Sequence, residues 1–361
     1  MTAALNLAER GLGDTWPNPS VGCILVKGEM VLARGVTQSG GRPHAEQVAL
    51  QHAGDSARGA TAYVTLEPCS HRGKTPPCAD ALIAAGVARV VVGATDLDPR
   101  VSGAGILKLR NAGITADGRG PWEARAQAVN RGFFLTVTAG RPLITLKTAT
   151  GLDGRIAMAS GESRWITGPE ARQAGHLLRS RFDAILVGSE TALADDPELT
   201  CRLEGYGGRP KVRVVLDRRL RLPARSKLAQ TAKSVPTWVM TTDEGAARGA
   251  ALADMGVELV AVDAATDGPA FMTAAVGALA KRGLTRVLVE GGGQVAASLL
   301  AADLVDEVAW FRAGRIMGDA ARPAVSRLAI DKLADTPRFN PVYSLALGPD
   351  WLDMLERNST L

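Results

Sequence analysis

Four residues in the first quarter of the chain have the types and the spacing of a hydrolytic metal centre: His44, Glu46, Cys69 and Cys78. One imidazole and two thiols suit zinc, and three protein ligands leave the fourth tetrahedral position open for water, whereas structural zinc sites usually have four ligands. Side chains two residues apart on a helix point about 200° apart, so His44 and Glu46 can face one ion only when it lies beyond the helix end. Pro43 and the prolines at 76–77 place His44 and Cys78 at helix starts of this kind.

The chemistry expected of this arrangement is hydrolytic deamination of an amino-substituted heterocycle, with one zinc ion per chain. Zinc lowers the pKa of its bound water to about 7. Glu46, which is not expected to be a ligand, can carry the proton from that water to the ring and to the departing ammonia. Zinc nucleobase deaminases combine this ligand set with a glutamate in this role. His52, inside the helix that follows, is expected to be a surface or packing residue.

Three other interpretations of the same residues stay open. His44 could be a polar helix start beside two core thiols. The site could be a zinc-bearing binding module without catalysis, in which case Glu46 is dispensable. The chain could also be a nucleic-acid deaminase joined to an accessory domain, but we find no basic and aromatic strand contacts near either cysteine.

Composition is that of an ordinary globular chain with about two domains. A length of 361 residues predicts about two domains. The chain is 46% hydrophobic and 22% charged, with no long apolar run or basic-then-apolar leader, so we expect neither a membrane span nor a secretory signal. The net charge of +5 is dispersed and aromatic residues are only 4%, which supports phosphate-bearing ligands weakly. The four cysteines favour a reducing compartment, the cytoplasm.

Short apolar strands alternate with helices along the whole chain, which predicts layered α/β structure. In the first part we expect strands at 21–26, 31–36, 61–66 and 89–92 and helices at 45–52, 79–85 and 123–131. A break in composition at 138–142 predicts a boundary between domains 1–140 and 143–361. In the second part we expect strands at 143–150, 184–187, 212–216, 237–241, 259–262 and 286–289 and helices at 171–181, 270–281 and 297–300. This is the pattern of a doubly wound, nucleotide-binding sheet.

The segment 65–78, Thr-Leu-Glu-Pro-Cys-Ser-His-Arg-Gly-Lys-Thr-Pro-Pro-Cys, resembles the bifunctional riboflavin-biosynthesis deaminase/reductase family. Zinc nucleobase deaminases of other kinds usually have two residues between the cysteines, whereas this chain has eight. Further motifs match in the family's order, and together they cover nearly the whole chain: 17–22, Lys147 with 152–154, 161–167, 194–197 and 290–292.

The resemblance implies a cytidine-deaminase-like three-layer α/β/α domain followed by a dihydrofolate-reductase-like doubly wound α/β domain. It also implies two activities: deamination of 2,5-diamino-6-ribosylamino-4(3H)-pyrimidinone 5′-phosphate, and then NADPH-dependent reduction of the ribosyl group to give 5-amino-6-ribitylaminouracil 5′-phosphate. We expect a homo-oligomer, a dimer or a tetramer, without nucleic-acid or membrane partners.

The resemblance also assigns binding residues. Those for the deaminase substrate are Asn18, His71 and Lys74. Those for the reductase substrate are Ser163, Arg179, Arg202 and Glu290. Those for the cofactor are Trp165, Thr167, Thr191, Asp195, Gly292 and Gly293. Plain structural alternatives exist for several: a turn residue at Asn18, a solvated loop charge at Lys74, a helix cap at Asp195, and a solvated helix face at Arg179.

Physical chemistry adds to these assignments in three places. Arg179 and Arg202 together suit a sugar phosphate, which prefers forked cationic donors. Bare amides at the helix start after 290–292 can bind a pyrophosphate, although the glycine spacing there is a weak signal. Lys147 and Asp153 are polar residues near the expected site whose roles stay open.

Cofactor preference depends on two conflicting signals after the strand at 212–216. Asp217 could bind a ribose 2′-hydroxyl and so favour NADH. Arg218 stands where the family commonly has a small hydroxyl residue, and its guanidinium can fork onto a 2′-phosphate. Because a charge-assisted hydrogen bond is worth about 1.5 to 3 kcal/mol, we expect Arg218 to bind the 2′-phosphate of NADPH.

Overall fold

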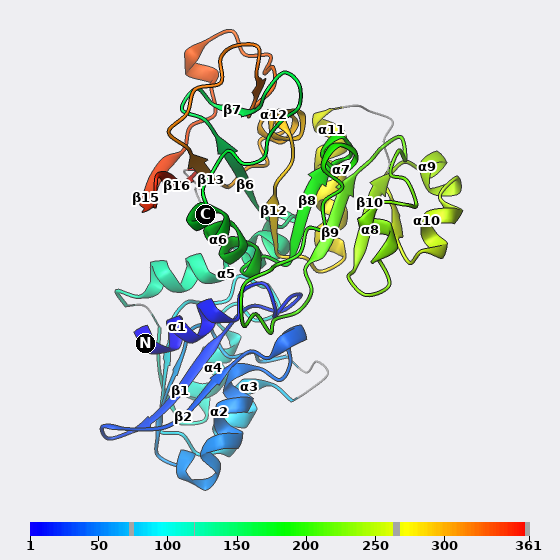
Figure 1. Cartoon of the computed structure of the whole chain (residues 1–361). Helices are drawn as coiled ribbons and strands as arrows, with labels where there is room; N and C mark the ends of the chain where they lie inside the picture. The colour runs from blue at the N-terminus through cyan, green and yellow to red at the C-terminus, as the bar shows by residue number, and fades with distance from the viewer. Residues whose placement is uncertain (72–75, 119, 263–267, 358–361) are drawn as a thin grey trace. The chain divides into compact units, whose positions relative to one another are not determined.

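The computed structural model describes residues 1–71, 76–118, 120–262 and 268–357. The chain forms two compact units, Met1–Arg141 and Pro142–Leu361. In Figure 1 the first unit runs from blue to blue-green and the second from green to red. Within the described ranges, no helix combines the length and the hydropathy that crossing a membrane requires.

A five-stranded sheet forms the centre of the first unit. Its strands, in the order β2-β1-β3-β4-β5, are β2 Met30–Val36, β1 Gly22–Lys27, β3 Thr61–Val64, β4 Arg89–Val92 and β5 Thr115–Asp117. β1 pairs antiparallel with β2 and β3, while β3, β4 and β5 are parallel. The helices are α1 Thr2–Arg10, α2 Ala45–Ala53, α3 Cys78–Ala84, α4 Ala104–Asn111 and α5 Glu123–Ala139, with 3₁₀ turns at Ser39–Gly41 and Gly54–Ala57. Helix α3 packs against both α2 and α4, and α1 packs against α5, so two groups of helices cover the sheet.

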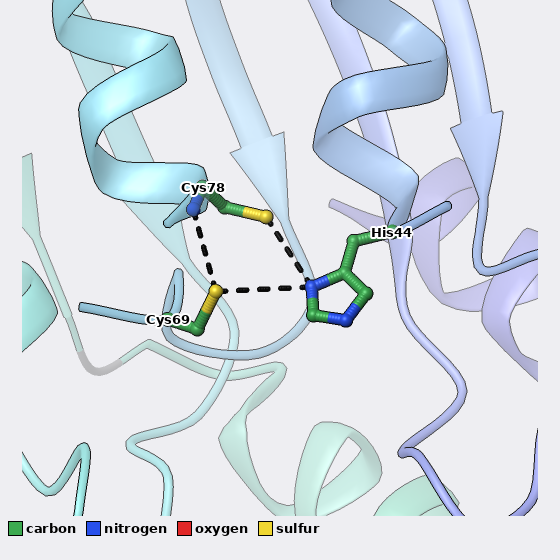
Figure 2. Close-up of side chains that lie close together, drawn as sticks. All are labelled: His44, Cys69 and Cys78. Atoms are coloured by element: carbon green, nitrogen blue, oxygen red, sulfur yellow. Dashed lines mark hydrogen bonds between the residues drawn. The ribbon is translucent and has the colours of Figure 1, made fainter. Parts of the chain in front are cut away.

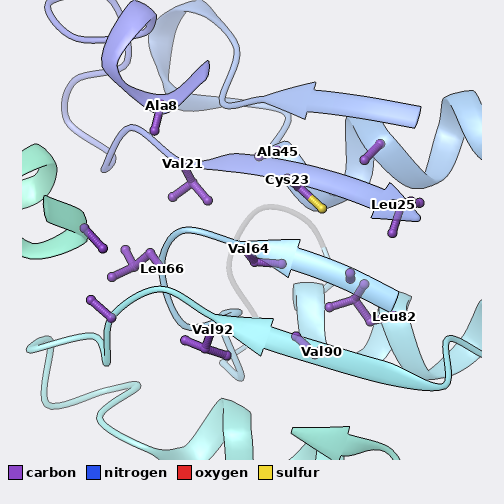
Figure 3. Close-up of a cluster of buried hydrophobic side chains, with 14 of the residues drawn as sticks. Ala8, Val21, Cys23, Leu25, Ala45, Val64, Leu66, Leu82, Val90 and Val92 are labelled. Atoms are coloured by element: carbon purple, nitrogen blue, oxygen red, sulfur yellow. The ribbon is translucent and has the colours of Figure 1, made fainter. Parts of the chain in front are cut away.

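The core of the first unit holds α2 close to the sheet. Figure 3 shows apolar side chains of the central strands, Cys23, Leu25, Val64 and Val90 among them, gathered into one cluster, and these residues are all buried. Helix α2 lies very close to β2, since a Cβ at Gly35 would stand 2.1 Å from the carbonyl oxygen of Ala45. Only glycine permits this approach, and the helix start is held against the sheet as a result.

The second unit contains a nine-stranded sheet in the order β11-β10-β9-β8-β12-β6-β13-β16-β15. The strands are β6 Leu143–Thr150, β8 Ala184–Gly188, β9 Val212–Leu216, β10 Thr237–Thr241, β11 Glu258–Ala261, β12 Arg286–Val289, β13 Glu307–Arg312, β15 Asn340–Leu347 and β16 Asp350–Glu356. The first seven in spatial order are parallel, and the β15–β16 hairpin adds antiparallel pairing at one edge. Strands β8, β9, β10 and β12 are buried nearly throughout, which explains their continuous apolar runs.

The helices of this unit connect the parallel strands. They are α6 Pro169–Ser180, α7 Ser189–Asp195, α8 Lys227–Gln230, α9 Asp243–Ala247, α10 Ala250–Asp254, α11 Pro269–Lys281 and α12 Gly293–Ala301, with a 3₁₀ turn at Leu333–Asp335. A small two-stranded sheet pairs β7 Arg155–Ala157 with β14 Arg322–Pro323. Because β12 lies between β8 and β6, the chain changes direction across the sheet there, and such switch points commonly bind ligands at the carboxyl ends of the strands.

The predicted strands at 89–92, 143–150, 212–216, 237–241 and 286–289 are confirmed to the residue. Two predicted helices differ from the observed ones by four residues or more at one end. The helix expected at 123–131 continues to Ala139, because Phe134 and Leu135 are buried beyond the predicted end. The helix expected at 297–300 already begins at Gly293.

Candidate active sites

Three potential metal ligands converge in the first unit, as Figure 2 shows. His44 is the residue immediately before α2, Cys78 is the first residue of α3, and Cys69 lies in the loop after β3. The His44 Nδ1 atom lies 3.3 Å from Cys78 Sγ and 3.8 Å from Cys69 Sγ, and the three ligand atoms all fall within 4.8 Å of one another. A tetrahedral zinc ion would separate its nitrogen and sulfur ligands by about 3.5 Å. The cluster therefore fits zinc.

The electrostatics of the cluster favour a thiolate. The Cys78 backbone N–H donates to Cys69 Sγ at 3.3 Å. Hydrogen bonds from Cys78 and His44 lower the pKa of the Cys69 thiol to about 4, although burial opposes this shift. The pKa of Cys78 is raised, because its proton is shared with Cys69 and because the thiol is buried. The amino ends of α2 and α3 both lie at the cluster, and their dipoles also stabilise negative charge.

Glu46 lies in the first turn of α2 and is only 3% exposed. Burial raises its pKa to about 7, although the nearby His44 opposes that shift. A carboxyl group with a pKa near neutrality can both accept and donate a proton at physiological pH. This is the property that the sequence-based mechanism requires of Glu46.

The residues expected to hold the deaminase substrate are described in part. Asn18 Nδ2 donates to the carbonyl oxygen of Gly41 at 2.8 Å and lies 3.3 Å from His44 Nε2, so Asn18 adjoins the metal cluster. His71 Nδ1 is buried and has no hydrogen-bond partner among the described residues. Lys74 lies outside the described residues.

Glu67 is a buried carboxylate that the sequence analysis did not single out. It accepts backbone N–H groups from Gly103 and Gly105 at 2.9 Å, and from Asp96 and Ile106 at 3.3 Å. These bonds join the segment just before Cys69 to the start of α4. The signal available in the sequence was an acid two residues before a metal-ligand cysteine in an otherwise apolar segment.

In the second unit, Glu290 follows β12 and forms a forked ion pair with Arg179 of α6. The two Arg179–Glu290 contacts measure 2.6 and 2.9 Å, and Arg179 Nη1 also donates to the Thr200 carbonyl oxygen at 2.8 Å. Lys147 Nζ lies 3.9 Å from Glu290 Oε2. Burial alone would raise the pKa of Glu290, but the charges of Arg179 and Lys147 outweigh it and hold that pKa at about 2.

Arg179 and Arg202, which we expected to bind a sugar phosphate together, differ in exposure and in contacts. The Arg179 side chain is 15% exposed and is committed to Glu290 and Thr200, so it is not a solvated helix face. The Arg202 side chain is 55% exposed, and its side-chain contacts with other described residues are long ones of 3.4 Å, to Glu198 and Thr200. Arg202 is therefore the more available cation for an anionic ligand.

The segment with Trp165 and Thr167 is held by a residue that the sequence did not single out. The guanidinium of Arg172 in α6 lies 4.6 Å from the centre of the Trp165 ring and donates to the Thr167 carbonyl oxygen at 2.9 Å. Trp165 is nevertheless 62% exposed, so one face of its ring can stack on a ligand. Ser163, two residues earlier, is half-buried.

The other expected cofactor residues follow β8 and β12. A Cβ at Gly292 would stand 3.4 Å from Thr191 Oγ1, which places the starts of α7 and α12 side by side. The carbonyl oxygen of Asp195 accepts a hydrogen bond from Arg164 at 3.2 Å. A Cβ at Gly293 would stand 2.6 Å from the Pro323 carbonyl oxygen, so close packing accounts for this glycine.

Asp217 and Arg218, the two residues expected to influence cofactor preference, have different surroundings. Asp217 is 1% exposed, and its Oδ2 accepts the Leu222 N–H at 2.7 Å. This carboxylate is therefore buried and bonded to the backbone rather than exposed to a ligand. Arg218 is half-buried, and its carbonyl oxygen accepts a hydrogen bond from Thr241. Nearby, Arg221 donates to Ser189 Oγ at 2.6 Å. After β9, the accessible charged groups are therefore the arginines rather than Asp217.

Asp153, whose role the sequence left open, accepts the backbone N–H groups of Met317 and Gly318 at 2.8 and 2.7 Å. These bonds hold the 315–318 segment against the turn between β6 and β7. Asp153 therefore has a structural role, and Lys147 is the better placed of the two residues for chemistry.

Comparisons with known proteins identify the family of each unit. Residues 142–352 match the family model "RibD C-terminal domain", and residues 1–94 match "Cytidine and deoxycytidylate deaminase zinc-binding region". The riboflavin biosynthesis protein RibD of Escherichia coli is 41% identical over 97% of this chain and 96% of its own length. That of Aquifex aeolicus is 38% identical over 99% and 97%.

Solved structures give the same result. The chain is similar to Acinetobacter baumannii RibD with a TM-score of 0.88 and 38% identity, covering 99% of this chain and 98% of the other. It is also similar to the diaminohydroxyphosphoribosylaminopyrimidine deaminase/5-amino-6-(5-phosphoribosylamino)uracil reductase of Thermotoga maritima, with a TM-score of 0.86, 36% identity and coverage of 99% and 97%. The expected order, a deaminase-type α/β unit followed by a reductase-type α/β unit, is confirmed. The chain belongs to the RibD family and is a bifunctional deaminase/reductase of riboflavin biosynthesis.

Proposed function

We propose that the first unit deaminates 2,5-diamino-6-ribosylamino-4(3H)-pyrimidinone 5′-phosphate and that the second reduces the ribosyl group of the product with NADPH. The observation that carries the proposal is the three-ligand cluster of His44, Cys69 and Cys78 beside buried Glu46. The deaminase and reductase activities for which the Thermotoga maritima relative is named support the choice of substrate, since its chain is covered almost completely.

In the deaminase unit, His44, Cys69 and Cys78 would hold zinc, which supplies an activated water when bound. Glu46 takes one proton from the attacking water and gives it to the ring nitrogen. It then takes the second proton from the added hydroxyl and gives it to the amino group, which leaves as ammonia while the carbonyl forms. The raised pKa of Glu46, about 7, suits both transfers. Asn18, beside His44, orients the pyrimidine, with His71 and Lys74 as its partners.

In the reductase unit, NADPH supplies the hydride that the C1 carbonyl of the ring-opened ribose accepts. Trp165, Thr167, Thr191, Asp195, Gly292, Gly293 and Arg218 are the residues proposed to bind it. Arg202 binds the substrate phosphate, and the Arg179–Glu290 pair with Ser163 lines the sugar. Lys147 would give a proton to the new hydroxyl oxygen. Its distance of 3.9 Å from Glu290 supports this role.

A two-signal assay on the full chain tests the proposal. The diamino pyrimidine phosphate is supplied with NADPH, and ammonia release and NADPH oxidation are measured separately. We expect ammonia first and NADPH oxidation only after it. Ammonia release from a single-stranded RNA or DNA instead, with none from the free nucleotide, would replace this function with nucleic-acid deamination.

We also propose that the enzyme works in the cytoplasm as a homo-oligomer, a dimer or a tetramer. Family membership and the small-molecule substrate support this view. Analytical ultracentrifugation across a hundredfold range of protein concentration tests the second part, and a monomer at every concentration would contradict it.

A further inference from the structure

Residues 200–202, which carry Arg202, are attached to α6 by three hydrogen bonds. Arg179 Nη1 donates to the Thr200 carbonyl oxygen at 2.8 Å. The Cys201 thiol donates to the carbonyl oxygen of His176 at 3.3 Å. The Arg202 backbone N–H donates to Nδ1 of the same His176, also at 3.3 Å. Two of the three bonds therefore end on His176, one turn before Arg179 in the helix.

The bond from Arg202 determines the state of the His176 ring. A ring nitrogen that accepts a hydrogen bond carries no proton, so the proton of the neutral imidazole is on Nε2. Burial and the charges of Arg179 and Arg202 lower the pKa of His176. The charged groups around the ring are Arg179 on its own helix, Arg202 on the attached segment, Glu290 after β12 and Lys147 on β6. The ring is therefore neutral at physiological pH and can accept the bond.

The ordering of the Arg202 side chain on binding an anion is easier when its backbone is already attached. It is 55% exposed, and its guanidinium contacts Glu198 and Thr200 only at 3.4 Å. A long exposed side chain loses rotamer freedom when it binds an anion. A fixed backbone reduces that loss, because only the side-chain torsions then have to be ordered.

We propose that His176 is a positioning residue of the reductase, which fixes the backbone of Arg202 so that its guanidinium meets the phosphate of the substrate. This inference rests on the proposed role of Arg202. His176 acts through Arg202 and touches neither the sugar carbonyl nor the cofactor in this role. It therefore contributes to substrate binding and leaves hydride transfer unchanged.

The test compares His176→Ala with His176→Asn in the full chain. The Asn side chain keeps an acceptor oxygen near the place of Nδ1, whereas Ala has none. With the deaminated pyrimidine phosphate as substrate, we expect His176→Ala to raise the reductase KM about threefold to tenfold, the effect of one lost hydrogen bond. We expect kcat and ammonia release to stay within about twofold of the wild type, and His176→Asn to restore most of the KM.

The neighbouring Leu177→Ala is the matched control, because Leu177 is 55% exposed on the same helix and should leave KM unchanged. An unchanged KM in His176→Ala would overturn the inference. Equal losses in the Ala and Asn variants would also overturn it, because size rather than the acceptor would then matter. A fall in kcat at constant KM would assign His176 to the chemical step instead.

Arg202→Ala separates this inference from the proposed function. If Arg202→Ala raises KM and weakens the competitive binding of ribose 5-phosphate while His176→Ala does neither, only the role of His176 fails. If Arg202→Ala changes neither quantity, the proposed phosphate contact fails as well.

A pH series gives a second readout. Protonation of Nδ1 would set an N–H against the Arg202 N–H, so KM should rise more steeply on acidification in the wild type than in His176→Asn. Parallel profiles would contradict the inference, because the phosphate and the other charged groups titrate equally in both proteins.

Discussion

Arg179 and Glu290 are joined by two parallel hydrogen bonds of 2.6 and 2.9 Å, with Glu290 12% exposed and Arg179 15% exposed. A bidentate pair of this kind fixes the orientation of both side chains. It also means that either charge, left without the other, would remain largely buried.

Arg179→Met should therefore destabilise the second unit by about 3 kcal/mol, because Glu290 would keep a buried charge that only the more distant Lys147, at 3.9 Å, offsets among the described residues. The double variant Arg179→Met/Glu290→Leu should recover most of this free energy of unfolding but not the reductase activity. Urea unfolding followed with the two activity assays measures both effects. A double variant as unstable as the single one would show that the charge is not the cause.

Acidification should weaken the second unit through the same carboxylate. The pKa of Glu290 is about 2, below its ordinary 4.5. A lowered pKa stabilises the fold above pH 4.5, and this contribution is lost as the pH falls towards 2. The shift corresponds to about 3 kcal/mol. Urea unfolding between pH 5 and pH 2 should show a smaller loss in Glu290→Gln than in the wild type, and equal slopes would contradict the assignment.

Glu46→Gln should reduce ammonia release at least about a hundredfold, because the amide keeps the shape of the side chain but carries no transferable proton. The reductase should keep its wild-type rate on substrate that is already deaminated. Circular dichroism shows whether the variant is folded. Equal loss of both activities in a folded variant would assign a structural role to Glu46.

Elemental analysis of the purified protein should find one zinc ion per chain. The double variant Cys69→Ser/Cys78→Ser should lose it, because the zinc site proposed at the cluster with His44 would keep only one of its three ligands. Cys201→Ser, in the second unit, is the matched control and should retain the metal. Full zinc content in the double variant would place the metal elsewhere.

The reductase should prefer NADPH to NADH, and Arg218→Ala should reduce that preference at least about tenfold, the effect of one lost charge-assisted hydrogen bond. Arg219→Ala, an exposed neighbour, is the control. Steady-state kinetics with both cofactors, together with calorimetric binding of adenosine 2′,5′-bisphosphate, measure the change. A wild type that uses NADH equally well would contradict the role of Arg218.

The sequence predicted the parts of the fold that have strong local signals. The buried strands of the second sheet are uninterrupted apolar runs with clear ends, and their bounds were found to the residue. The β15–β16 hairpin was missed, because β15 is exposed along nearly its whole length and so lacks an alternating pattern. Gly132 lies within α5 without ending it, and only the burial of Phe134 beyond it shows why.

Residue types identified the metal cluster, but not the groups that support it. His44, Cys69 and Cys78 carry their chemistry in their side chains, so type and spacing were sufficient. Glu67 and His176 act through backbone groups distant in sequence, such as Gly103, and no local pattern encodes such partners. The same reason explains why Arg179 was paired with Arg202 rather than with Glu290.

The close approach of Gly35 to Ala45 makes the metal centre sensitive to mutation at a residue that is not one of its ligands. Any side chain at position 35 would push on the backbone that directly follows His44, since a Cβ there stands only 2.1 Å from the Ala45 oxygen. A missense allele at this strand position would resemble a metal-site mutation, although residue 35 holds no ligand. Zinc binding would therefore depend on a residue that contributes only the absence of a side chain.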